Sequence, residues 1–122
     1  MYSEKILKHF KNPKFAGEIK NPDAVGQVGN PRCGDVMKIF LKVKDDVIKD
    51  IKFKTYGCIA AIAASDMMCE LAKGKTIDNA LKINPDDIVK GLGHMPPIKY
   101  HCSILGTQAL KKAIENYKRP KK

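Results

Sequence analysis

The feature that most constrains the fold is a pair of alternating runs on either side of Lys44-Asp45-Asp46. Apolar residues recur along one side of both runs: Met37, Ile39, Leu41 and Val43, then Val47, Ile51 and Phe53. Successive side chains of a β-strand point to opposite faces, and several lysines fill the positions between these apolar residues. Two such runs around a short polar turn predict an antiparallel hairpin with one face in the core and one in water.

Helical patterns flank this hairpin. Ser3 is a typical helix N-cap, and Asn12-Pro13 ends the first helix because a residue before proline avoids helical geometry. The other expected elements are a short strand near 25–28, a helix that follows Cys58 and ends near Gly74, two short helices capped by Thr76 and Asn84, and a final helix to about Tyr117. This order predicts an α+β domain with a small antiparallel sheet of about three strands and helices packed on one face. The 122 residues fit a single domain spanning 1–122.

Charge and hydropathy argue against two classes of protein, those that bind nucleic acid and those that span a membrane. The net charge of +10 is evenly divided: residues 1–54 carry twelve basic and seven acidic groups, and residues 55–122 carry eleven and six. Nucleic-acid-binding proteins usually gather their charge in a dense patch that includes arginines, and this chain has only two. The longest apolar run, 58–64, is far shorter than the roughly 20 residues that a bilayer span needs, and the start resembles no signal peptide. We expect a soluble, cytoplasmic protein that binds neither nucleic acid nor membrane.

The positions of the four cysteines carry most of the chemical information. In a cytoplasmic chain, cysteines favour metal or thiol chemistry over structural disulfides. Cys33 precedes Asp45 by twelve residues and Cys58 follows it by thirteen, so the two arms of the hairpin should return both thiols to the same end of the sheet. Cys58 also precedes a helix, whose positive end favours the thiolate that binds metal or attacks sulfur.

A third cysteine, Cys102, stands beside His101 near the start of the last helix. If that end folds back to the hairpin, three thiolates, one imidazole and the Asp35 carboxylate converge, but periodicity alone does not establish this return. No pair has the Cys-x-x-Cys spacing of a zinc ribbon, so spacing by itself is a weak metal signal. We interpret Cys69 as a small buried hydrophobe on the apolar side of its helix.

Other polar and sulfur-containing residues have simpler interpretations. His9 is expected on the surface of the first helix, and His94 in a loop exposed to water. The adjacent Met67 and Met68 are expected to fill the core rather than to bind a cofactor.

Three blocks, each containing one cysteine, resemble the signatures of the IscU/NifU-type iron–sulfur cluster assembly scaffolds. They are Gly29-Asn30-Pro31-Arg32-Cys33-Gly34-Asp35-Val36-Met37, then Lys54-Thr55-Tyr56-Gly57-Cys58 with Ala61-Ile62-Ala63-Ala64-Ser65, and then Met95-Pro96-Pro97-Ile98-Lys99-Tyr100-His101-Cys102-Ser103. The opening, with Tyr2-Ser3-Glu4, His9-Phe10 and Asn12-Pro13, is similar too. The resemblance runs from end to end, and three separated blocks in the right order make it highly specific.

The resemblance implies a scaffold rather than an enzyme. A cysteine desulfurase of the IscS/NifS type would deliver sulfur as persulfide, iron would be added, and a transient 2Fe–2S cluster would form and pass to acceptor apoproteins. Cys33, Cys58 and Cys102 would be the cluster ligands, with Asp35 or His101 as the fourth. Cys102 would be the favoured persulfide acceptor, and Lys99 would support its thiolate or the anionic cluster electrostatically. An imperfect fourth ligand would help a scaffold to release its product.

Departures from the family pattern qualify these implications. The chaperone-docking stretch of the family usually reads Leu-Pro-Pro-Val-Lys, and here Met95 and Ile98 replace the Leu and the Val, which counts against docking of an Hsp70-type chaperone. After Cys58 the family generally has a small residue, whereas this chain has Ile59. The spacing from Cys58 to Cys102 leaves no room for the insertion of the SufU-type zinc-dependent sulfur acceptors.

Two alternatives to the cluster scaffold follow from the sequence. The same ligands suit tetrahedral zinc, so a zinc-bound persulfide acceptor is the alternative function. A basic nucleic-acid-binding module rests on the net charge alone. The sequence leaves open a monomer and a homodimer that shares the cluster.

Overall fold

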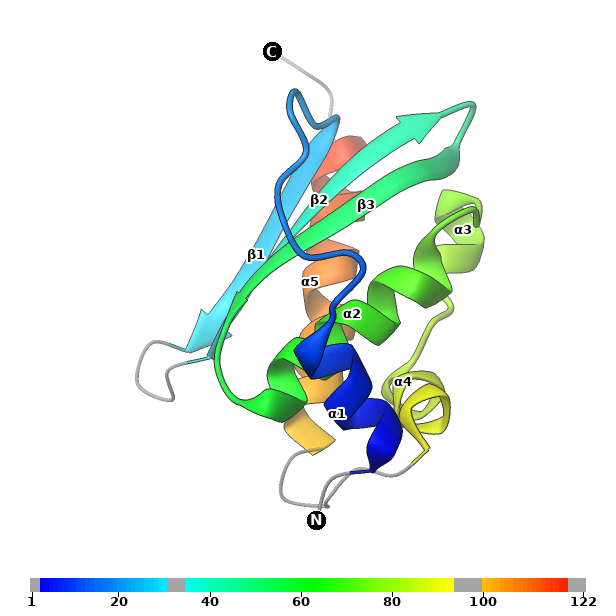
Figure 1. The fold of residues 1–122 in the computed structure, drawn as a ribbon. Coiled ribbons are helices and arrows are strands. Elements are labelled where there is room, and N and C mark those ends of the chain that lie inside the picture. Colours follow the sequence, from blue (N-terminus) through cyan, green and yellow to red (C-terminus); the bar gives the residue numbers. More distant parts are fainter. Residues whose placement is uncertain (1–2, 31–34, 94–99, 119–122) are drawn as a thin grey trace.

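The computed structural model describes residues 3–30, 35–93 and 100–118. Its elements are α1 (Glu4–Lys11), β1 (Ala24–Asn30), β2 (Asp35–Lys44), β3 (Val47–Tyr56), α2 (Ile59–Ala72), α3 (Ile77–Ala80), α4 (Pro85–Leu92) and α5 (Tyr100–Lys118). The strands form one antiparallel sheet in the order β1-β2-β3, with α5 against β1 and β2, and α2 against β3 (Figure 1). The predicted α+β fold, with three strands and helices on one face, is confirmed.

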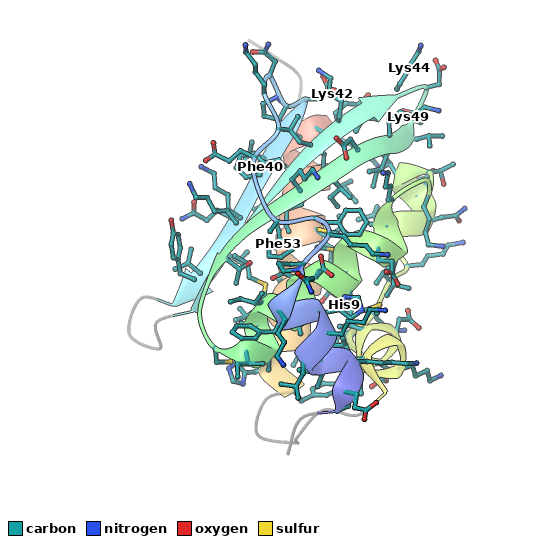
Figure 2. All side chains as sticks on the ribbon, in the orientation of Figure 1. His9, Phe40, Lys42, Lys44, Lys49 and Phe53 are labelled. Atoms are coloured by element: carbon teal, nitrogen blue, oxygen red, sulfur yellow. The ribbon has the colours of Figure 1, made fainter. Side chains whose placement is uncertain are left out.

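The hairpin forms where the alternating runs predicted it. Asp45 and Asp46 make the connection with φ of 55° and 60°, a left-handed pair that matches the natural twist of two antiparallel strands. Apolar residues of β2 and β3 are buried on the helix side: Met37, Ile39, Leu41, Ile48, Ile51 and Phe53. Lys42, Lys44 and Lys49 lie around the turn end (Figure 2). The lysine-rich alternate positions therefore face away from the core.

One residue of the hairpin differs from the prediction. Val47 was expected on the core face, but Ile48 is fully buried there and Val47 is half-buried. The cause is a register shift between Lys42 and Val43, where Lys42 pairs with Asp50 while Val43 pairs with Ile48. The extra residue on β3 reverses the alternation near the turn, which a strict period of two does not anticipate.

Side chains at the helix starts explain where the helices begin. The Ser3 hydroxyl accepts a hydrogen bond from the Ile6 N–H at 3.1 Å, and Thr76 caps α3 in the same way. Asn84 and Asp87 form a reciprocal capping box at the start of α4. These starts agree with the predictions. Among the described residues, no helix combines the length and the apolar character needed to cross a membrane.

Candidate thiol site

Two helix starts and the ends of two strands meet at one end of the sheet. β3 ends at Tyr56, which pairs with Val36 next to the first residue of β2. Cys58 follows two residues later as the N-cap of α2, and Cys102 is the third residue of α5. Because α5 packs along the sheet and against α2, its first turn lies beside the start of α2. The fold therefore brings together two cysteines that are 44 residues apart in the chain.

The sulfur atoms of Cys58 and Cys102 lie 3.9 Å apart. The Nε2 atom of His101 lies 3.7 Å from the Cys102 sulfur. Two thiols and an imidazole at this separation suit soft-metal binding and thiol–disulfide chemistry. Within residues 3–30, 35–93 and 100–118, no group of three or more His, Cys, Asp or Glu side chains is arranged to hold a metal ion.

The two thiols differ in their access to solvent. Cys102 is completely buried, Cys58 is partly exposed, and His101 is exposed. Two large apolar side chains are exposed near these cysteines in the sequence: Tyr56, 63% exposed, precedes Cys58 by two residues, and Ile104, 38% exposed, follows Cys102 by two. Of the two thiols, Cys58 is therefore the one that solvent reaches.

Several residues singled out in the sequence lie outside the described residues. These are Cys33, His94 and Lys99, together with the Met95–Lys99 stretch. For Asp35 the structure describes the backbone, which pairs with Asn30 at the start of β2, but not the side chain. Of the predicted ligand set, the described residues that come together are therefore Cys58, His101 and Cys102.

Cys69 has a structural role, as its position in an apolar pattern predicted. It is fully buried in α2 among the core residues, and the neighbouring Met67 and Met68 belong to the same core. Burial raises the pKa of the Cys69 thiol well above its usual value, and the nearby Asp66 carboxylate raises it further. Its complete burial in the core keeps Cys69 apart from the chemistry at Cys58.

The prediction for His9 is wrong. Its side chain is only 14% exposed, and its Nδ1 lies 2.5 Å from Oδ2 of the buried Asp66 in α2. The sequence signal was available in Asp66, a charged residue inside an otherwise apolar helix, because a buried carboxylate needs a partner. This contact joins α1 to α2.

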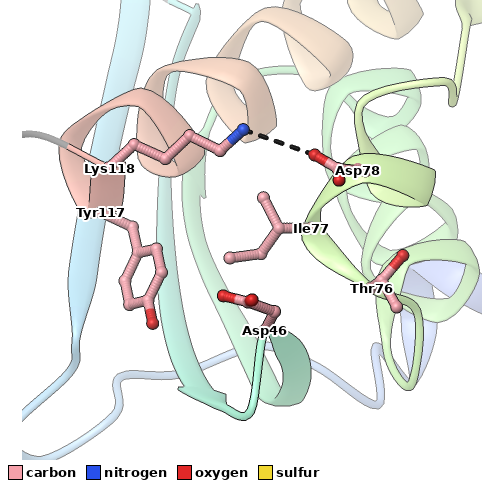
Figure 3. Close-up of a pocket in the computed structure, with 6 residues that line it drawn as sticks. All are labelled: Asp46, Thr76, Ile77, Asp78, Tyr117 and Lys118. Carbon is pink, nitrogen blue, oxygen red and sulfur yellow. Dashed lines mark hydrogen bonds and ion pairs between the residues drawn. The ribbon is translucent and has the colours of Figure 1, made fainter.

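The pocket in Figure 3 lies at the opposite end of the sheet from the thiols. It has a volume of about 230 Å³ and is lined by Asp46, Thr76, Ile77, Asp78, Tyr117 and Lys118. The Lys118 ammonium pairs with the Asp78 carboxylate at 3.4 Å across it (Figure 3). These six residues include no thiol or imidazole, so the sulfur chemistry belongs to the other end.

Comparison with curated proteins identifies close relatives. The chain is 56% identical over 117 residues to iron–sulfur cluster assembly scaffold protein IscU 1 of Archaeoglobus fulgidus, covering 96% of this chain and 76% of that protein. It is 47% identical over 121 residues to the iron–sulfur cluster assembly scaffold protein IscU of Escherichia coli K12, covering 96% of this chain and 94% of that protein. These similarities extend over nearly the whole chain.

Solved structures and a family model agree with these relatives. A putative iron–sulfur cluster assembly scaffold protein for the SUF system, from Fervidobacterium islandicum, superimposes with a TM-score of 0.78 at 28% identity, covering 93% of this chain and 96% of that one. The family model described as the NifU-like N terminal domain matches residues 1–122. The chain belongs to the NifU-like N-terminal domain family.

Proposed function

We propose that this protein is a scaffold on which iron–sulfur clusters are assembled and from which they are passed on. The observation that carries the proposal is the 3.9 Å separation of the Cys58 and Cys102 sulfur atoms at the end of the sheet where β2 begins. The relatives from A. fulgidus and E. coli are named as scaffolds for this assembly. The role is that of a non-enzymatic scaffold, and the iron and sulfur are its cargo.

We assign the ligands from the thiols and from chain connectivity. Cys58 and Cys102 supply two thiolates, and Cys33 supplies the third. Cys33 is two residues before Asp35 in the chain, and the backbone of Asp35 lies at this end of the sheet. Asp35 or His101 supplies the fourth ligand, and a 2Fe–2S cluster suits such a set because thiolates are its usual ligands.

The kinds of partner protein can be inferred from the iron and sulfur that the scaffold would carry. A cysteine desulfurase delivers sulfur, with Cys102 as the persulfide acceptor and Lys99 as its electrostatic support. Acceptor apoproteins remove the finished cluster. The exposed side chain of Tyr56, two residues before Cys58, offers an apolar contact to a docked partner. The sequence counts against chaperone docking at Met95–Lys99 and leaves open a monomer and a homodimer that shares the cluster. A cytoplasmic location remains a prediction from the sequence.

Anaerobic reconstitution tests this function. The reduced protein is incubated with ferrous iron, cysteine, a dithiol reductant and a catalytic amount of desulfurase, and visible charge-transfer absorption is recorded together with bound iron and acid-labile sulfide. We expect a coloured product whose yield falls sharply in Cys33→Ala, Cys58→Ala and Cys102→Ala. Cys69→Ala is the matched control and should retain the wild-type yield, because Cys69 is buried in the core. A colourless wild-type product, or an equal loss in the control, would contradict the proposal.

Zinc binding is the alternative for the same residues. Two thiolates with an imidazole and a further ligand suit tetrahedral zinc as well as iron. Metal analysis of protein purified anaerobically, combined with sulfur transfer to Cys102, separates the two functions. Stoichiometric zinc that persists during sulfur transfer, with no cluster formed when iron is added, would favour the zinc-bound persulfide acceptor.

A further inference from the structure

The thiols of Cys58 and Cys102 are close enough to form a disulfide as well as to bind one metal centre. A disulfide needs a sulfur–sulfur distance of about 2.05 Å, so the Cys58 and Cys102 sulfur atoms, now 3.9 Å apart, would have to approach by about 2 Å. The Cys58 side chain makes no capping hydrogen bond to α2, so no such bond opposes its rotation. A small side-chain movement at Cys58 would bring the two sulfur atoms into reaction.

The two thiols also have different environments. Cys58 is partly exposed at the start of α2, and the first turn of that helix contains no acidic residue to offset its positive end. Cys102 is completely buried in α5. A sulfur atom carried by Cys102 would therefore be bonded to a buried residue that lies beside the more accessible thiol of Cys58.

A chemical requirement connects this geometry to the proposed function. A persulfide carries its outer sulfur in the zero-valent state, whereas the bridging sulfur of a cluster is sulfide. Two electrons must reach that sulfur before it can bridge iron. A pair of neighbouring thiols holds these two electrons, because it releases them when it becomes a disulfide.

We propose that Cys58 is a resolving thiol that releases sulfide from a persulfide on Cys102, an inference that rests on the proposed scaffold function. The Cys58 thiolate attacks the inner sulfur of the Cys102 persulfide. A sulfur–sulfur bond forms between the two cysteines, the bond to the outer sulfur breaks, and the outer sulfur leaves as hydrosulfide with both electrons of that bond. The two cysteines are oxidised to a disulfide and the outer sulfur is reduced to sulfide.

His101 is placed to assist the departure of the outer sulfur. Its Nε2 lies 3.7 Å from the Cys102 sulfur, and its side chain is exposed. An N–H of the ring at this position would donate a hydrogen bond to the hydrosulfide that leaves. A dithiol reductant must then reduce the Cys58–Cys102 disulfide before a second turnover, so a single turnover needs no reductant.

A single-turnover experiment without iron tests the inference. A desulfurase that carries one equivalent of persulfide, freed of cysteine by gel filtration, is mixed anaerobically with the reduced protein. Released sulfide is trapped with bimane and counted, and peptide mass spectrometry measures the Cys58–Cys102 disulfide and the Cys102 persulfide. We expect about one sulfide and one disulfide per sulfur accepted. Cys58→Ser should retain the persulfide on Cys102 and lower sulfide release at least tenfold.

Controls separate this inference from the scaffold function. Serine is a favourable N-cap residue, so Cys58→Ser should keep α2 intact, which circular dichroism verifies. Cys69→Ser should release sulfide like the wild type, because Cys69 is buried in the core away from the pair. A stable persulfide on the wild-type protein, or equal sulfide release by Cys58→Ser, overturns the resolving role and leaves the scaffold function standing. A wild-type protein that accepts no sulfur overturns both.

Discussion

Asp66 shows how a single buried residue determines where the N-terminal helix packs. Its side chain is 1% exposed, and both carboxylate oxygens have partners: Oδ2 contacts His9 Nδ1, and Oδ1 accepts a hydrogen bond from the Phe15 N–H at 2.9 Å. A buried carboxylate without such partners is strongly unfavourable. Asp66 therefore fixes α1 and the segment that follows it against α2.

Substitution at this contact should show energetic coupling. His9→Ala removes one partner of the buried carboxylate, and we expect the free energy of unfolding to fall by about 1–3 kcal/mol. In an Asp66→Asn background the same change should cost clearly less, because no charge remains to be satisfied. Urea unfolding of the four proteins of this cycle measures the coupling. Equal costs in both backgrounds would show that the two side chains do not stabilise each other.

The raised pKa of the Cys69 thiol leads to a prediction of how the free energy of unfolding depends on pH. Its pKa is raised in the folded protein by burial, so the unfolded thiol ionises at a lower pH than the folded one. Above the usual cysteine pKa of about 8.5 the unfolded state binds fewer protons, and the free energy of unfolding should fall by up to about 1.4 kcal/mol per pH unit from this group. Cys69→Ala under reducing conditions should remove this part of the slope. Identical slopes in the two proteins between pH 9 and 10.5 would contradict the assignment.

The packing of β1 against α5 depends on a close approach of their backbones at Gly26. A Cβ atom at this position of β1 would lie 2.3 Å from the Ala113 nitrogen and 2.6 Å from the Ala109 oxygen, both backbone atoms of α5. Such distances are shorter than any van der Waals contact, so the strand and the helix could not keep their spacing. The glycine and the two alanines together let α5 lie directly against the sheet.

Gly26→Ala should therefore disrupt the packing of α5. We expect the free energy of unfolding to fall by about 3 kcal/mol, at the upper end for an overpacked site, because backbone must move. Gln27→Ala is the matched control, since Gln27 is the next residue of β1 and is exposed. Thermal and urea unfolding compare the two variants. A Gly26→Ala protein as stable as the control would mean that β1 and α5 are not packed this closely.

Local patterns predicted the elements, and contacts between distant residues produced the errors. Caps such as Ser3 and Asn84 act within three residues, so the sequence around a helix start is enough to find it. The alternation of the hairpin is equally local. The register shift near Lys42 is a property of two strands together, which explains why Val47 was placed on the wrong face.

At the scale of the whole molecule, the site depends on a return of the chain that periodicity could not predict. Counting residues from the turn along each arm of the hairpin led to the expectation that Cys33 and Cys58 share one end of the sheet. Cys58 does lie where β3 ends. The place of Cys102 beside it depends on α5 packing across β1, β2 and α2, so the resemblance to known scaffolds anticipated it better than spacing did. The contact between His9 and Asp66 joins residues 57 apart and was missed for the same reason.

An anaerobic crystal structure of the protein loaded with iron and sulfide tests the central claim most directly. The account predicts a 2Fe–2S cluster at the end of the sheet where Cys58 and Cys102 lie, bonded to the sulfur atoms of Cys33, Cys58 and Cys102 and to one atom of Asp35 or His101. Iron bound elsewhere on the molecule, or a cluster that leaves any of these three thiols beyond bonding distance, would contradict it.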